Sequence, residues 1–393
     1  MINNTALRAG VPGRFGAWIR YGGDPITRKQ LEFAVQNYSV AILQPWEQDA
    51  ALYLKKNAPD MVVLAYKCLS STRSYEPGPI YSSGVSWDTA QQALQNGKDL
   101  YARRTDGSLI EWRGYPQHYQ MAVWDYRWYW MDSVVKELRD SPFDGVMGDN
   151  DIESDYYGLN LPIRNVDSMA TVRAGLDHLI EYAGAELNKA GKILVPNIAE
   201  ARLRWGKWEA HSAYGGGFEE VWLGWGAQEF LDSTYAMLQS RHIGRGAQGQ
   251  VRLAYDEGLQ RADRTAPKVT ILRTPSGSPK APVTGTDENL LYGLAGFWIF
   301  GGGRFTGIAV TEHDSYNGTP FSPEMSYDLG TPAEAVKSDG AVHARAFTHG
   351  WAAINLGTTS RMVRVPSGLK DAAGNTPPST LTLQAHRGVL YRK

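Results

Sequence analysis

Short apolar runs alternate with segments of helical periodicity from residue 14 to residue 311 of this 393-residue chain. A short apolar run bounded by turn residues is typical of a buried strand, whereas apolar residues spaced three and four apart form one face of a helix. On this basis we expect eight strands, at residues 14–21, 39–44, 61–69, 143–149, 192–198, 214–220, 269–274 and 305–311.

Helix signals occupy most of the segments between these strands. The helix predicted over 119–140 is the best marked, because its apolar residues at 124, 128, 131, 135 and 138 lie on one face. A capping-box spacing, Thr27 to Gln30, begins the helix after the first strand. Further helices are expected at residues 48–57, 172–187, 227–241, 249–263 and 286–300.

Eight strands alternating with helices predict an α/β fold with a parallel sheet, and eight such units favour closure into a (β/α)8 TIM barrel. An open doubly wound sheet is the alternative. That fold usually carries a glycine-rich phosphate loop after its first strand, and Gly22-Gly23-Asp24 lacks this fingerprint. Gly301-Gly302-Gly303 is not a P-loop either, because no Gly-Lys-Ser/Thr follows it.

Two segments depart from the alternating pattern. Residues 70–118 form an insertion that is rich in Ser, Gly, Pro and Tyr. We expect it to sit over one end of the barrel and to shape a wall of the site, since long loops in compact domains tend to be functional. After residue 318, short alternating runs separated by turn residues predict a small C-terminal antiparallel all-β domain. The predicted organisation is a barrel over 1–318 and a β-sandwich-like domain over 319–393.

Composition narrows the function classes. The formal net charge is −1, with 40 basic and 41 acidic residues and no basic run, which disfavours a nucleic-acid partner. The single cysteine, Cys68, cannot form an intrachain disulfide. The first residues contain no signal-peptide core and no apolar run has membrane length, so we expect a soluble protein with no membrane partner. Location and oligomeric state stay open, and secretion is possible if a signal has been trimmed.

The 13 Trp and 21 Tyr residues are the unusual part of the composition. Flat aromatic faces that are not needed in the core are suited to stack on the apolar faces of sugar rings. The eight histidines show no metal-ligand spacing and no HExxH motif occurs, so neither a metal nor another cofactor is expected. No GxSxG motif is present, which disfavours a serine hydrolase.

Chemistry in a barrel is carried by residues at the carboxyl ends of the strands. Asp149 ends the fourth strand, and Glu219 and Glu220 end the sixth. Aligning these strands by Gly145 and Gly216 places Asp149 opposite Glu220, which favours Glu220 as the inward residue and leaves Glu219 as the alternative. A carboxylic acid and a carboxylate across a sugar bond are what glycoside hydrolysis requires.

Other strand ends supply candidate substrate-binding residues. Aromatic side chains there are candidate stacking platforms or pocket walls, and polar ones are candidate partners of sugar hydroxyls. The candidates are Trp18, Tyr21, Gln44, Trp46, Tyr66, Lys67, Asp151, Asn197, Trp222 and Glu312.

The segment Val134-Val135-Lys136-Glu137-Leu138, followed by Phe143-Asp144-Gly145-Val146-Met147-Gly148-Asp149-Asn150, resembles the fourth-strand motif of barrel glycoside hydrolases related to the α-galactosidase superfamily, above all its poorly characterised glycosyl-hydrolase groups. In that superfamily an aspartate at the end of strand four is typically the nucleophile, and an acid/base often comes from strand five or six. The resemblance therefore implies Asp149 as nucleophile and Glu220, or Glu219, as acid/base. The stretch 344–355 resembles the all-β domain that often follows such barrels.

The sequence thus predicts a glycosidase that cleaves an oligo- or polysaccharide. A non-catalytic carbohydrate-binding barrel is the alternative, and it would keep the aromatic residues without needing both acids. A metal-dependent hydrolase or lyase is a third possibility, which the absence of clustered histidines disfavours. The sugar, the linkage, internal or terminal cleavage, and retention or inversion of configuration are left open.

Overall fold

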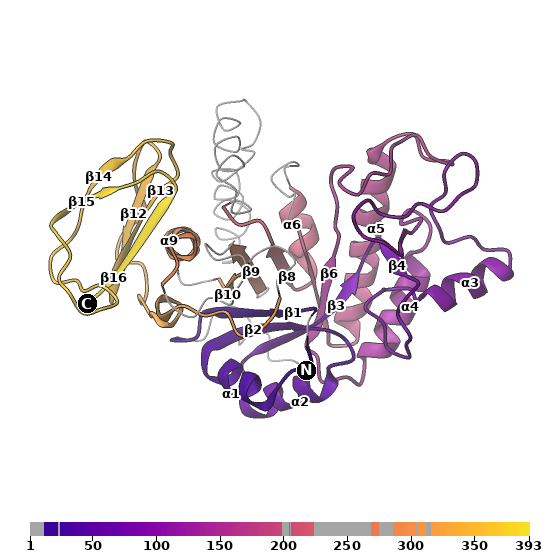
Figure 1. Ribbon diagram of the computed structural model, residues 1–393, viewed down its shortest axis with the longest axis horizontal. Coiled ribbons are helices and arrows are strands. Elements are labelled where there is room, and N and C mark those ends of the chain that lie inside the picture. The colour runs from indigo at the N-terminus through magenta and orange to yellow at the C-terminus, as the bar shows by residue number, and fades with distance from the viewer. Residues whose placement is uncertain are drawn as a thin grey trace.

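The computed structural model describes residues 12–22, 24–198, 204, 206–223, 269–274, 286–302, 305–311 and 316–393. Eight parallel strands form one sheet in the order β7-β6-β3-β2-β1-β10-β9-β8 (Figure 1). The two ends of this sheet meet, because parallel bridges join Leu194 to Gly215 and Asn197 to Phe218. The sheet is therefore a nearly closed (β/α)8 barrel, as predicted.

All eight predicted strands are present in the barrel. Alternate side chains point inward, so that Val40, Ile42, Leu64 and Ile271 share the apolar cluster of the interior, while intervening ones pack against the helices outside. The strands are β1 Gly16–Arg20, β2 Tyr38–Leu43, β3 Val62–Cys68, β6 Gly145–Asp149, β7 Ile193–Pro196, β8 Gly216–Glu219, β9 Val269–Thr274 and β10 Gly307–Val310.

Five predicted helices are present in the described residues, one of them with a later start, whereas α3 Trp87–Gln95 and α6 Lys207–His211 were not predicted. Thr27 forms the expected capping box with Gln30. The helix predicted from residue 119 begins at Arg127, because His118–Gln120 forms a short strand, β5. The helices expected at 227–241 and 249–263 lie outside the described residues. The helices are α1 Arg28–Asn37, α2 Gln48–Asn57, α3 Trp87–Gln95, α4 Arg127–Leu138, α5 Met169–Lys189, α6 Lys207–His211 and α9 Glu288–Gly301.

The insertion lies over the mouth of the barrel where β3 and β6 end. Its strand β4, Ser71–Arg73, follows β3 directly and pairs with β5. Its Trp112 joins the apolar cluster of the barrel interior together with Tyr66. The Trp112 ring stacks on Tyr157 of the β6–α5 loop, with 3.7 Å between ring centroids. Side chains of the insertion therefore reach the end of the barrel at which a site is expected.

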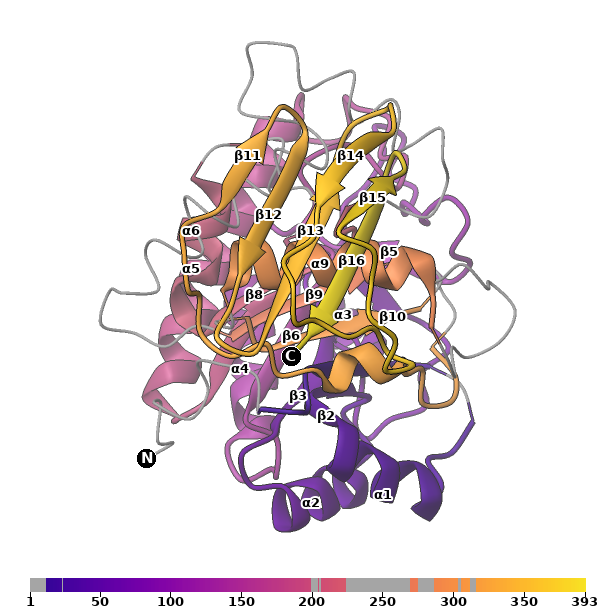
Figure 2. The same cartoon turned by 90° about the vertical axis from the view of Figure 1, so that its left-hand side faces the viewer.

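The C-terminal residues form antiparallel sheets joined to the barrel through α9 (Figures 1 and 2). One face of α9 packs on Leu272 and Ile308 of the barrel and another on Ala352 and Leu390 of the sheet, within one apolar cluster. A helix that is apolar all round is typical of such a buried position. No helix among the described residues has the length and apolar character that spanning a membrane requires. The strands are β11 Lys337–Asp339, β12 Val342–Ala346, β13 Gly350–Asn355 and β16 Arg387–Arg392 in one sheet, and β14 Arg361–Arg364 with β15 Thr380–Leu383 in the other.

Candidate active site

Two carboxylates are linked at the mouth of the barrel by one amide. Asp149 is the last residue of β6, Glu220 directly follows β8, and Asn197 directly follows β7, which lies between them. The Asn197 Nδ2 atom donates to Asp149 Oδ1 at 2.9 Å and to Glu220 Oε2 at 2.7 Å. The two N–H bonds of an amide diverge by about 120°, so the two accepting oxygens lie about 5 Å apart.

Asp149 accepts hydrogen bonds at both of its carboxylate oxygens. Tyr66 donates its hydroxyl to Oδ2 at 2.6 Å, and the backbone N–H of Asn150 donates to Oδ1 at 2.9 Å. Burial, and then the negative charge of Glu220, raise the pKa of Asp149, while the hydrogen bonds from Tyr66, Asn197 and Asn150 act in the opposite direction. Asp149 therefore binds a proton more readily than an exposed aspartate does.

Glu220 accepts from two tyrosine hydroxyls in addition to Asn197. Tyr21 donates to Oε1 at 3.0 Å and Tyr316 donates to the same oxygen at 2.8 Å. Burial, followed by the charge of Glu220, raises the pKa of both tyrosines, which keeps their hydroxyls neutral. Arg273 Nη1 donates to the backbone carbonyl of Glu220 at 2.8 Å and fixes the main chain at this point.

The alternation of side chains along β8 separates the two candidate glutamates. Phe218 belongs to the apolar cluster of the barrel interior. The next residue, Glu219, points to the opposite face, where its Oε1 accepts from the backbone N–H of Val221 at 3.0 Å. Glu220 returns to the inner side. The structure therefore brings Glu220 into the group around Asp149 and places Glu219 on the other side of the barrel wall.

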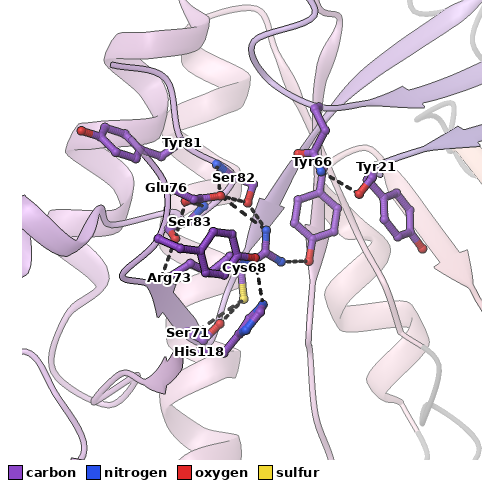
Figure 3. A network of polar contacts seen from close by, with 12 residues as sticks. Tyr21, Tyr66, Cys68, Ser71, Arg73, Glu76, Tyr81, Ser82, Ser83 and His118 are labelled. Atoms are coloured by element: carbon purple, nitrogen blue, oxygen red, sulfur yellow. Dashed lines mark hydrogen bonds and ion pairs between the residues drawn. The ribbon is translucent and has the colours of Figure 1, made fainter. Parts of the chain in front are cut away.

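The insertion contributes an arginine to this group. Arg73 Nη2 donates to the Tyr66 hydroxyl at 2.8 Å, and its guanidinium lies over the Tyr66 ring (Figure 3). Glu76, which accepts from the backbone N–H of Ser82 at 3.0 Å, is paired with Arg73 at 3.5 Å. Because Arg73 occupies the acceptor side of the Tyr66 hydroxyl, the hydroxyl hydrogen is directed at Asp149.

Three predicted substrate-binding residues face away from this group. Trp18 is only 1% exposed and stacks on Tyr38 behind the sheet. Trp222 is equally buried and donates its indole N–H to a backbone carbonyl of α9. Lys67 points outward from β3 and pairs with Glu137 of α4 at 2.7 Å. The structure does not bring these three residues to the carboxylates. For Trp18 and Lys67 the reason is that adjacent residues of a strand point to opposite faces, and only one of them faces the site.

Asp151, also predicted to contact substrate, belongs instead to a group of buried charges. Its Oδ2 lies 2.6 Å from His211 Nδ1, the other ring nitrogen of His211 lies 2.8 Å from Asp177, and Lys207 lies 3.2 Å from Asp151 Oδ1. Burial alone would lower the pKa of His211, but the charge of Asp151 and the two carboxylate hydrogen bonds outweigh it and raise the pKa. Across the part of the chain that is described, no group of three or more His, Cys, Asp and Glu side chains is arranged to hold a metal ion.

Gln44 and Trp46 line a cavity of about 680 Å³ that also borders Tyr21. Gln44 Nε2 donates to the backbone carbonyl of Tyr21 at 2.6 Å. Of the predicted site residues, Tyr21, Tyr66 and Asn197 therefore meet at the carboxylates, and Gln44 and Trp46 lie beside them. Glu312 lies outside the described residues.

The sequence prediction missed three polar residues that contact this group. Tyr316 lies in a loop and Arg73 ends the three-residue strand β4, and neither segment has a periodic pattern, so no sequence signal separated them from the other tyrosines and arginines. Arg273 had a signal, because it is a basic residue at the end of the apolar strand β9 and is 0% exposed. A buried charge in such a position is costly and marks a function or a structural pairing.

Comparison with known proteins gives a family and several distant structural relatives. Residues 55–351, more than half of the chain, match a family described as hypothetical glycosyl hydrolase family 15. No curated protein sequence matches the chain. Similar solved structures include Aspergillus fumigatus Ega3 in complex with galactosamine, with 11% identity over 78% of this chain and 93% of that one and a TM-score of 0.43. A Flavobacterium johnsoniae GH31 dextranase gives 11% identity over 98% and 52%, with a TM-score of 0.47.

Proposed function

The chain belongs to hypothetical glycosyl hydrolase family 15, and from this premise we propose that it cleaves glycosidic bonds of an oligo- or polysaccharide with Asp149 and Glu220 as the catalytic pair. The observation that carries the proposal is the Asn197 amide nitrogen that hydrogen-bonds both carboxylates at the mouth of the barrel. Most glycoside hydrolases use two carboxyl groups that flank the scissile bond.

The separation of the pair supports hydrolysis with retention of configuration. Carboxyl groups about 5–5.5 Å apart are typical of retaining enzymes, whereas inverting enzymes need about 6.5–9.5 Å to admit a water molecule. A single nitrogen atom bonds one oxygen of Asp149 and one of Glu220, and the separation of about 5 Å between these two oxygens is consistent with the shorter range. In the proposed reaction Asp149 attacks the anomeric carbon while Glu220 protonates the leaving oxygen, and Glu220 then activates the water that releases the sugar.

The hydrogen bonds favour this division of roles. The donors to Asp149 are fixed, since a backbone N–H and an amide N–H cannot accept, and the Tyr66 hydroxyl is held as a donor by Arg73. Two of the donors to Glu220 are tyrosine hydroxyls, which can turn so that their oxygens accept a hydrogen bond from a protonated carboxyl group. Burial and the charge of Glu220 raise the pKa of Asp149, and the three donors oppose this by favouring the ionised form that a nucleophile requires.

Hydrolysis of a panel of bacterial and fungal polysaccharides tests the proposal. Wild type is expected to release product from at least one, and Asp149→Asn, which removes the nucleophile, is expected to lose activity by roughly a thousandfold or more, at least as much as the loss of a catalytic acid or base. Glycan binding without product, unchanged in the variant, would instead identify a carbohydrate-binding barrel.

Azide rescue separates the two roles. If Glu220 is the acid/base, Glu220→Ala regains activity with azide and gives a glycosyl azide of the same anomeric configuration as the substrate. If Asp149 is the nucleophile, Asp149→Ala with azide gives the opposite configuration. The reverse pattern would exchange the roles.

A further inference from the structure

The cavity of about 680 Å³ adjoins the carboxylate pair without containing it. Its walls come from two parts of the chain: Tyr21, Gln44 and Trp46 belong to the barrel, and Arg73 and Tyr75 belong to the insertion. Tyr21 lines the cavity and also donates its hydroxyl to Glu220 (Figure 3 shows Tyr21 beside Tyr66). A ligand in the cavity would therefore contact Tyr21, which itself contacts the carboxylate of Glu220.

Two aromatic residues with exposed rings line this cavity. Trp46 is 50% exposed and Tyr75 is 51% exposed, in a molecule whose other large apolar side chains are mostly buried. Exposed aromatic surface that gathers in a concave site is typical of ligand recognition. The apolar faces of sugar rings are matched to such flat surfaces.

The cavity also offers a hydrogen-bond acceptor and a donor that the described protein atoms leave unused. Gln44 is 8% exposed, and while its Nε2 is fixed on the Tyr21 carbonyl, its buried Oε1 has no donor within the described chain. The buried Nε of Arg73 likewise has no acceptor there. Buried polar groups in native proteins nearly always have partners. A sugar hydroxyl is donor and acceptor at once, so it can satisfy either atom once that side chain turns toward the cavity.

We propose that this cavity is a subsite that binds neutral sugar units next to the cleaved bond, with Trp46 and Tyr75 as stacking surfaces and Gln44 Oε1 as a hydroxyl acceptor. Neutral units are specified because both carboxylates that line the cavity face a cation. Glu76 is paired with the Arg73 guanidinium, and the positive charge of Arg20 acts on Glu47. The assignment of the cavity to the substrate of the same enzyme rests on the proposed function. A subsite in this cavity implies that the substrate is a sugar chain that continues past the scissile bond, not a simple glycoside of one sugar.

Binding to the inactive Asp149→Asn protein tests the subsite without cleavage. Isothermal titration with cello-, xylo-, malto-, manno- and chito-oligosaccharides of one to six units is expected to show, in one series, at least a tenfold gain in affinity between one and three units. Adding Trp46→Ala or Tyr75→Ala is expected to reduce that affinity at least tenfold, and Gln44→Leu severalfold. Trp128→Ala is the matched control, since Trp128 on α4 is 57% exposed and does not line the cavity.

Two results would overturn the subsite: no oligosaccharide binds, or the Trp46 and Tyr75 variants bind as the Trp128 control does. Failure of the hydrolase proposal looks different. If the cavity variants weaken binding but wild type releases no product from the bound series, the subsite stands and catalysis does not. If wild type cleaves and the cavity variants cleave long chains equally well, catalysis stands and the subsite is wrong.

Discussion

At the scale of single residues, Asn197 links the carboxylates of Asp149 and Glu220, because its amide nitrogen donates a hydrogen bond to each. Its hydrogen bond is among those that lower the pKa of Asp149 against the effects of burial and of Glu220. Asn197→Ala removes that bond, so the pKa of Asp149 rises. Because the nucleophile must be ionised, the acidic limb of the kcat/KM profile is expected to move to higher pH, and kcat to fall by about 10–100-fold. An unchanged profile would show that Asn197 does not act on the pair.

Arg73 is expected to act on Asp149 through Tyr66. Arg73→Met leaves the Tyr66 hydroxyl free to turn away, and kcat is expected to fall by about tenfold, as for loss of a hydrogen bond to a charged group. In a Tyr66→Phe background the same change is expected to have little further effect, since residues acting through one network are not additive. Arg28→Met, at an exposed ion pair on α1, is the control. If the effects of Arg73→Met and Tyr66→Phe on kcat were additive, Arg73 would not act on Asp149 through Tyr66.

Side-chain alternation explains which residues the sequence identified. The comparison of Asp149 with Glu220 used the inward alternation of each strand, and the structure places both residues on the inner side. Trp18 and Lys67 were chosen by proximity to a strand end alone, and both face the helices. Loop residues such as Tyr316 reach the site through tertiary folding, which a single sequence does not specify.

At the scale of elements, the β6–α5 loop that follows Asp149 is held by the ion-pair group of Asp151, His211 and Asp177. The pKa of His211 is raised in the folded state, so its contribution to stability is complete below its unfolded value of about 6.5 and is lost as pH rises through the folded pKa. His211→Gln is expected to lower the melting temperature more at pH 6 than at pH 8.5. Exposed His178→Gln on α5 is the control. A loss independent of pH would mean that His211 is neutral when folded.

Strands were easier to predict than the contents of the insertion. A strand buried on both faces appears as a continuous apolar run, and the barrel strands had this signal except β8, whose glycines weaken it. Within the insertion, α3 and the three-residue strands β4 and β5 are short and lie in a Ser-, Gly- and Pro-rich segment. β5 also explains the late start of α4, because its residues pair with β4 instead of continuing the helix.

At the scale of the whole molecule, α9 shares one core with the barrel and with the C-terminal sheet. A Cβ atom at Gly388 of β16 would lie 2.6 Å from the Leu291 carbonyl oxygen of α9, so the backbones must separate to admit it. Gly388→Ala is expected to cost about 1–3 kcal/mol, as overpacking does. Calorimetry of Gly388→Ala is expected to show a single unfolding transition at a lower melting temperature. Met362→Ala, at an exposed side chain, is the control and is expected to leave the melting temperature unchanged. Two transitions, of which only one moves, would show that the sheet is an independent domain.

The most direct test of the central claim compares Glu220→Gln with Glu219→Gln on the polysaccharide that wild type cleaves. The two changes replace the same carboxyl group by an amide in neighbouring residues, one beside Asn197 and one on the opposite face of β8. The account predicts that Glu220→Gln lowers kcat by about a hundredfold or more, the range of general acid–base catalysis, and that Glu219→Gln stays within a few-fold of wild type. Loss of activity in Glu219→Gln with Glu220→Gln still active would contradict it.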